Sequence, residues 1–107
     1  MIARIWRGWT AAGDADAYAE YLLETGMTTA RETPGNRGAY FLRRIDRGRA
    51  EFVTVILWDS LEAIRAFAGD EIERARFFPE DDRYLVEREH TVTHYEVFDP
   101  ELPEGFG

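Results

Sequence analysis

The hydrophobic pattern of Glu51–Phe67 predicts a strand that runs directly into a helix. Every position from Phe52 to Trp58 is apolar or β-branched, which is typical of a strand covered on both faces. Asp59 and Ser60 offer an N-cap and an acidic first turn. The apolar residues that follow at helical spacing are Leu61, Ile64, Phe67 and Ala68. A helix of the same chain covers only one face of this strand, so the other face requires a second partner, most simply another copy of the chain.

Alternating apolar and polar positions predict further strands, and helical spacing predicts another helix. The predicted strands are 2–9, 38–46, 50–58 and 89–98. The helix begins at Asp14 or Asp16 and ends by Gly26 or continues towards Arg31. Its apolar stripe consists of Ala15, Tyr18, Tyr21 and Leu22.

Breaks in the pattern separate these elements. Gly48 supplies the positive φ of a tight hairpin turn between the second and third strands. The helix that begins at Ser60 is interrupted at Gly69, and a short helical piece then ends at Arg76. Residues 77–84 are expected to form an irregular connection, in which three consecutive acids (80–82) make a solvated turn.

The element order βαββαβ predicts an α+β, ferredoxin-like domain over residues 1–98, followed by a C-terminal tail at 99–107. Right-handed crossovers place the first and third strands side by side in an antiparallel sheet, with both helices on one face. The apolar residues left on the other face are Ala3, Ile5, Val53, Val55 and Leu57. Such a patch exceeds what monomers usually expose. We therefore expect an isologous homodimer whose sheets meet face to face.

Composition narrows the classes of function. The 107 residues carry a net charge of −8, which argues against nucleic acid as a partner. No cysteine is present, which excludes thiolate nucleophiles and disulfides. All 13 basic residues are arginine, so Schiff-base chemistry on lysine is excluded. No apolar run approaches the ~20 residues of a membrane span, and we expect a cytoplasmic protein that needs no metal or cofactor and contacts no membrane.

Four segments carry a resemblance to a known family. They are MIARIWRG (1–8), GNRGAYFLRR (35–44), EFVTVILWDSLEAIRAFAG (51–69) and TVTHYEVF (91–98). Together they resemble the antibiotic biosynthesis monooxygenase family, and the resemblance implies the dimeric α+β barrel fold. Its superfamily includes cofactor-independent monooxygenases, haem-degrading enzymes, isomerases and proteins without known activity.

Individual positions refine what the resemblance implies. Members that oxygenate quinol-like polyketides are similar to this chain at Trp58, but they have an asparagine where Thr54 stands. Haem-degrading members have an asparagine, a tryptophan and a haem-ligating histidine at the positions of Trp6, Phe67 and Phe77. Because none of these three is retained, haem degradation is not expected.

Strand parity predicts a candidate pocket. The residues that share one face of the third strand are Phe52, Thr54, Ile56 and Trp58. If Trp58 matches the family tryptophan, this face looks into the cleft beneath the helices, and Arg4 and Trp6 look into the same cleft. An aromatic pocket with one guanidinium suits a flat, partly anionic aromatic molecule. The residues predicted to bind it are Trp6, Thr54, Trp58 and Phe67; the alternative is that the tryptophans only fill the core.

His94 is the candidate general base, because imidazole titrates near neutrality. With Arg4 holding the anion, the hypothesis is cofactor-independent oxidation of a small aromatic or quinol by O₂. Two alternatives stay open at this point. His94 is a core or interface residue hydrogen-bonded to a neighbour, or the whole protein is a non-catalytic ligand-binding or dimeric assembly module, which Thr54 favours.

Overall fold

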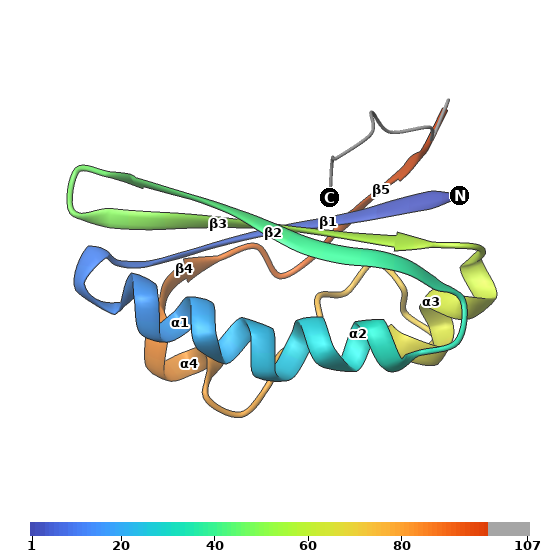
Figure 1. The fold of residues 1–107 in the computed structure, drawn as a ribbon, viewed down its shortest axis with the longest axis horizontal. Helices are drawn as coiled ribbons and strands as arrows, with labels where there is room; N and C mark the ends of the chain where they lie inside the picture. Colours follow the sequence, from blue (N-terminus) through green and yellow to red (C-terminus); the bar gives the residue numbers. More distant parts are fainter. Residues whose placement is uncertain (99–107) are drawn as a thin grey trace.

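The computed structural model describes residues 1–98, which form one antiparallel sheet with helices on a single face (Figure 1). The strands are β1 (Ile2–Ala11), β2 (Asn36–Asp46), β3 (Arg49–Trp58), β4 (Leu85–Arg88) and β5 (Thr93–Glu96). Their order is β2-β3-β1-β4, and β5 pairs with the other end of β1. The predicted ferredoxin-like plan, with the first and third strands adjacent, is confirmed.

One long helical segment, which connects β1 to β2 in the chain, packs on the sheet. It consists of η1 (Ala12–Asp14), α1 (Ala15–Leu22), η2 (Leu23–Met27) and α2 (Thr28–Glu32). The η2 turn is a π-helix, which widens the backbone in the middle of the segment. Two shorter helices, α3 (Leu61–Ala68) and α4 (Asp81–Tyr84), lie on the same face of the sheet.

The junction of β3 and α3 follows the sequence prediction. The side chain of Ser60 accepts a hydrogen bond from the backbone N–H of Ala63 and caps α3. Gly69 ends the helix with φ 89°, a value that favours glycine. At the other end of β3, the β2–β3 turn has positive φ at both Arg47 and Gly48, as a two-residue hairpin turn requires.

The predicted helical piece at 70–76 was wrong. These residues pair instead with the segment that precedes β5: Ala75 N–H donates to His90 O, and Val92 N–H donates to Glu73 O. Because the partners are distant in sequence, local helix signals do not reveal this pairing. The predicted strand 89–98 is too long, because only β5 (Thr93–Glu96) forms within it, and β4 (Leu85–Arg88) lies before it, where no strand was predicted. Residues 81–84 of the predicted irregular connection form α4. The tail prediction for 99–107 lies outside the described residues.

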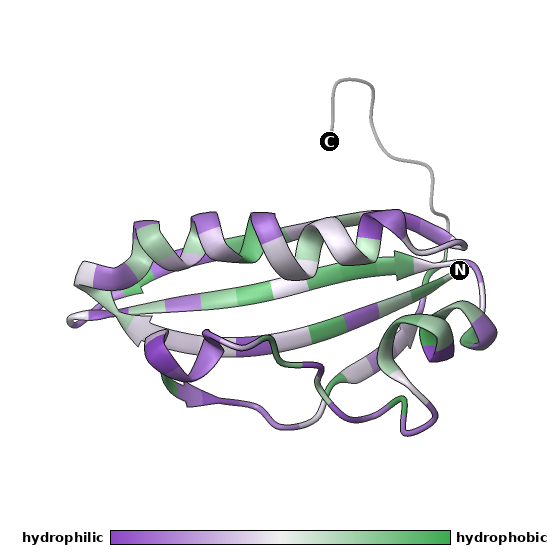
Figure 2. Cartoon of the chain, turned by 90° about the horizontal axis from the view of Figure 1, so that it is seen from below, coloured by the Kyte–Doolittle hydropathy of each residue, from purple (hydrophilic) through white to green (hydrophobic). Residues whose placement is uncertain are grey.

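The core lies between the sheet and the helices. Figure 2 views the helix-covered face and shows the long helical segment along one edge of the sheet and α3 and α4 towards the other edge, with the central strands visible between them. The strand residues predicted to face the helices are all buried: Phe52, Thr54, Ile56 and Trp58. Arg4 and Trp6 of β1 are buried on the same face. The predicted parity of both central strands is therefore confirmed.

Candidate functional site

A cavity of about 50 Å³ lies above β1 and β3, between α1–η2 and the connection from α3 to α4. Its aromatic walls are Trp6, Phe67, Phe77 and Phe78. The polar and charged residues that line it are Arg4, Tyr18, Thr54, Arg76 and Asp81. The π-turn contributes Gly26 and Met27, so the irregular part of the long helical segment faces the cavity. Such turns are frequent at functional sites.

Arg4 places a buried cation at this cavity. Only 3% of the residue is exposed, and burial lowers the pKa of Arg4 to about 10, so the guanidinium stays protonated at neutral pH. It donates hydrogen bonds to the carbonyl oxygens of Ile72 and Arg74, the latter at 2.7 Å. Within residues 1–98, no carboxylate forms an ion pair with it. The cation is therefore solvated by backbone oxygens rather than neutralised.

His94 lies beside Arg4 and not at the cavity wall. The two residues are opposite each other on β1 and β5, and Arg4 Nη1 is 3.0 Å from His94 Nε2. Because guanidinium nitrogens only donate, Nε2 accepts and the ring proton sits on Nδ1. Burial, followed by the charge of Arg4, lowers the pKa of His94. His94 is therefore neutral at pH 7, and its free lone pair is directed at Arg4.

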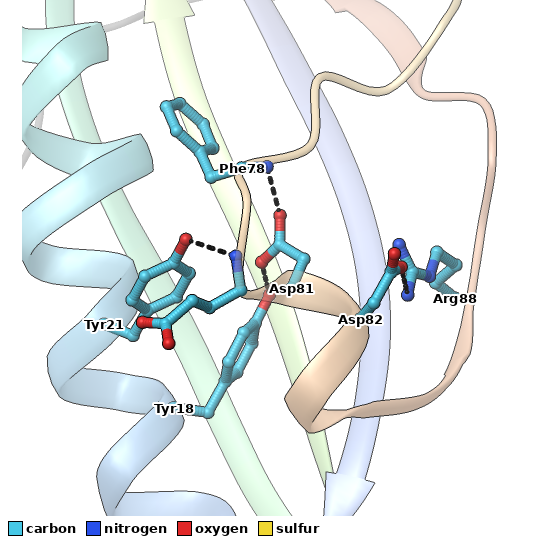
Figure 3. A network of polar contacts seen from close by, with 7 residues as sticks. Tyr18, Tyr21, Phe78, Asp81, Asp82 and Arg88 are labelled. Carbon is cyan, nitrogen blue, oxygen red and sulfur yellow. Dashed lines mark hydrogen bonds and ion pairs between the residues drawn. The ribbon is translucent and has the colours of Figure 1, made fainter.

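A buried tyrosine–carboxylate pair lies at the cavity (Figure 3). Tyr18 Oη donates to Asp81 Oδ1 at 3.0 Å, and the backbone N–H of Phe78 donates to Asp81 Oδ2 at 2.6 Å. Burial raises the pKa of Asp81, and burial together with the negative charge of Asp81 raises the pKa of Tyr18. Close by, Arg88 pairs with Asp82 at 2.5 Å.

Aromatic contacts hold the walls in place. The Trp6 indole N–H donates to Glu89 O at 2.7 Å, and its ring meets Phe77 edge-on with centroids 6.1 Å apart. Arg76 lies over both Phe67 and Phe78, with its guanidinium carbon 5.1 and 5.0 Å from the two ring centroids. The wall formed by residues 75–78 is thus held by an edge-on ring contact and by one exposed cation that lies over two rings.

The structure brings four of the six predicted site residues to the cavity: Arg4, Trp6, Thr54 and Phe67. His94 touches Arg4 instead. Trp58 is fully buried against Phe67, and its indole N–H has no acceptor among the described residues. The functional roles assigned to all six stay predictions.

Asp81 and Tyr18 were missed as site residues. The expected solvated acidic turn is correct for Glu80 and Asp82, which are exposed, but wrong for Asp81, which is only 4% exposed. Three adjacent acids look alike in the sequence. The single available signal was Tyr18 itself, a polar hydroxyl on an apolar helical stripe that needs a buried partner.

Neither a metal cluster nor a membrane span is seen in residues 1–98. No three His, Cys, Asp or Glu side chains converge as metal ligands in this part of the chain. No helix there is long and apolar enough to cross a membrane.

Comparisons with known proteins relate this geometry to a family. The model of the antibiotic biosynthesis monooxygenase family matches residues 1–76. Among curated proteins, none matches the sequence. A solved structure from Bacillus cereus, assigned by name to the same family, has 18% identity and a TM-score of 0.65, covering 94% of this chain and 97% of that one.

Two further structures share the fold. One from Nitrosomonas europaea, named for the same family, has 16% identity and a TM-score of 0.60, covering 91% of this chain and 98% of its own. The haem degrader MhuD from Mycobacterium tuberculosis, solved with two haems bound, has 20% identity and a TM-score of 0.55, covering 91% and 95%. At these identities the likeness shows the fold alone.

Proposed function

Because this chain belongs to the antibiotic biosynthesis monooxygenase family, we propose that it binds a small, flat aromatic molecule in the cavity and oxidises it with O₂ without a cofactor. One observation carries the proposal. Arg4 is a buried cation without a carboxylate partner in residues 1–98, at a cavity walled by aromatic rings. A buried charge without a counter-ion is costly, so an anionic aromatic ligand is favoured there.

The chemistry requires an electron-rich phenol. Loss of its proton leaves a phenolate whose charge spreads over the ring, and Arg4 stabilises that charge in a water-poor site. The ring carbon para to the oxygen then gains one oxygen atom from O₂, and the second oxygen atom leaves as water. The overall reaction is phenol plus O₂ to quinone plus water, which balances atoms and electrons without a reductant.

The cavity must enlarge to admit such a ligand. Its volume of about 50 Å³ is smaller than the roughly 150 Å³ that holds a benzene ring in an engineered apolar cavity. The wall at 75–78 is the part that we propose to move, because it lacks regular secondary structure and Arg76 is exposed. Closure of this wall over the ligand would exclude water.

A base role for His94 demands a rearrangement. Its Nε2 accepts a hydrogen bond from Arg4, so it takes a ligand proton only after Arg4 releases it. In the present geometry we propose that His94 positions the guanidinium.

The second candidate is a non-catalytic binding module. It is favoured by the engagement of Arg4 with two backbone carbonyls and His94, which leaves fewer donors for a ligand. Thr54, which stands in place of the family asparagine, also favours a non-catalytic binding module.

Haem is a poor fit to these residues. MhuD shares the fold and was solved with haem, but Trp6, Phe67 and Phe77 occupy the positions at which the resemblance implies the asparagine, tryptophan and histidine of haem-degrading members. No histidine lines the cavity in the described part of the chain.

We also propose a homodimer formed by the sheet face opposite the helices. In residues 1–98 no helix covers this face (Figure 1). Val53, Val55 and Leu57 of β3 alternate with the buried, helix-facing residues, and Tyr40 and Leu42 of β2 pair beside them while remaining 44% and 56% exposed. Val55 is already buried within one copy, and two copies meeting through this face would bury the other four side chains.

Oxygen consumption tests the proposed oxidation. The panel is 1-naphthol and other electron-rich phenols whose para carbon is unsubstituted, each with its methyl ether as the non-ionising counterpart. We expect O₂ uptake with the phenols only, and at least a tenfold loss in Arg4→Gln, since a charge-assisted hydrogen bond is removed. Arg43→Gln, on an exposed arginine of β2 that pairs with Asp16, is the matched control. Ligand binding without O₂ uptake would support the binding module instead.

A further inference from the structure

The proposed oxidation leaves one buried ionisable group at the cavity unexplained. Asp81 is 4% exposed and accepts one hydrogen bond on each oxygen, from Tyr18 and from the backbone of Phe78. A carboxylate offers about four acceptor positions, so two remain. Asp81 and Tyr18 both line the cavity, where an unfilled acceptor meets a ligand rather than bulk water.

The anionic side of the cavity, formed by Asp81 with Tyr18, and the cationic side, formed by Arg4, lie at different positions along the sheet. Arg4 is opposite Ile56 of β3. Tyr18 packs edge-on against Phe52, with ring centroids 5.0 Å apart. These two β3 residues are four positions apart, which corresponds to roughly 13 Å along a strand. A flat ligand lying along the strand between the aromatic walls therefore meets a carboxylate and a guanidinium at different points.

We propose that Asp81 accepts the hydroxyl proton of the bound aromatic, so that the substrate class is a phenol whose hydroxyl faces Asp81 and whose para edge faces Arg4. This assignment rests on the proposed function. The ligand O–H bond breaks, a carboxyl O–H bond forms on Asp81, and the electron pair stays on the phenolate oxygen. Its charge spreads to the para edge, where Arg4 stabilises it. The proton leaves in the water formed when O₂ reacts.

The surroundings of Asp81 suit a proton acceptor. An ordinary carboxylate is a weak base towards a phenol, because its pKa lies far below that of the phenol. Burial raises the pKa of Asp81 and so narrows the difference between the two pKa values. Four groups face it from the packed elements. Phe78 N–H, Tyr18 and Arg88 lower the pKa of Asp81, whereas Asp82 raises it. Asp82 and Arg88 thus shift the pKa of Asp81 in opposite directions, although neither of them lines the cavity.

Binding of two matched probes tests the hydroxyl contact. We expect the wild-type protein to prefer 1-naphthol over 1-methoxynaphthalene by about 10- to 100-fold, as for a hydrogen bond to a charged group. Asp81→Asn should reduce the preference to about that of a neutral hydrogen bond, because the amide oxygen still accepts but carries no charge, and Glu80→Gln, which removes an exposed charge from the same segment, should retain it. Equal binding of both probes to the wild-type protein overturns the assignment, as does an undiminished preference in Asp81→Asn.

The pH profile of O₂ uptake tests proton transfer and does not depend on Asp81→Asn folding. The acidic limb should move to higher pH in Tyr18→Phe and Arg88→Gln, and to lower pH in Asp82→Asn. An acidic limb that stays in place in all three variants overturns the role of Asp81 as acceptor. A hydroxyl preference without any O₂ uptake would overturn the proposed oxidation while supporting the contact to Asp81.

Discussion

A Cβ added to Gly8 would lie 2.3 Å from Cη2 of Trp6, because the indole ring of Trp6 lies over this glycine. The ring has little freedom to move away, since its N–H donates to Glu89 O and Leu85 Cδ2 is 3.0 Å from the same Cβ position. Glycine at position 8 therefore sets the orientation of one cavity wall.

Gly8→Ala should destabilise the protein by about 1–3 kcal/mol, the usual cost of overpacking. Urea unfolding measures this difference. Gly13→Ala is the matched control, because nothing lies within 4 Å of a Cβ at Gly13. Equal stability of the two variants would show that the Trp6 ring adjusts freely.

The two buried tryptophans on the helix-facing side of the sheet should respond differently to phenylalanine. Trp6→Phe removes a hydrogen bond and leaves Glu89 O without that donor, whereas Trp58→Phe removes an N–H that has no acceptor in residues 1–98. We expect Trp6→Phe to cost about 1 kcal/mol more in the free energy of unfolding. Denaturant titration of both variants decides this. A larger loss in Trp58→Phe would mean that its indole N–H is paired in solution.

Acid should weaken the fold through His94. Its pKa is lowered from 6.5 in the folded protein, so below that pH the unfolded chain binds a proton that the folded chain resists. The stability that neutral His94 contributes to the folded protein is fully present above pH 6.5. It is lost as the pH falls from 6.5 through the lower pKa of His94 in the folded protein. Protonation would also place two cations side by side at Arg4.

His94→Gln should flatten the dependence of unfolding free energy on pH in this window, because glutamine offers Arg4 an acceptor that does not titrate. Thermal unfolding across the window is the measurement, with His90→Gln, on the exposed histidine, as the control. An unchanged slope in His94→Gln would contradict the assignment.

Charge on the uncovered sheet face should dissociate the proposed dimer. Leu42→Glu places a carboxylate among Tyr40, Val53 and their copies, and should shift sedimentation at micromolar concentration towards the monomer. Leu61→Glu is the control, because Leu61 is also an exposed leucine, at 44%, but lies on α3. A wild-type monomer under these conditions would refute the dimer itself.

Local patterns in the chain were sufficient for most of the architecture. The unbroken apolar run of β3, the cap at Ser60 and the spacing of Ile64 and Phe67 depend only on neighbouring residues. The period of two along a strand likewise places Arg4 and Trp6 on one face, and the resemblance of Trp58 to the family tryptophan implies that this face looks towards the helices. This is why the adjacency of the first and third strands and the covered face of the sheet were predicted correctly. Arg4, Trp6, Thr54 and Phe67 line the cavity, and their roles there stay predictions.

Contacts between distant segments were beyond the reach of those patterns. Asp81 is buried while Glu80 and Asp82 are exposed, because Tyr18, more than sixty positions away, provides its hydrogen bond. His94 faces Arg4 rather than the cavity for the same kind of reason. Periodicity states which face of an element a side chain occupies, but the partner that it meets there depends on how the elements pack, and that partner sets charge state and accessibility.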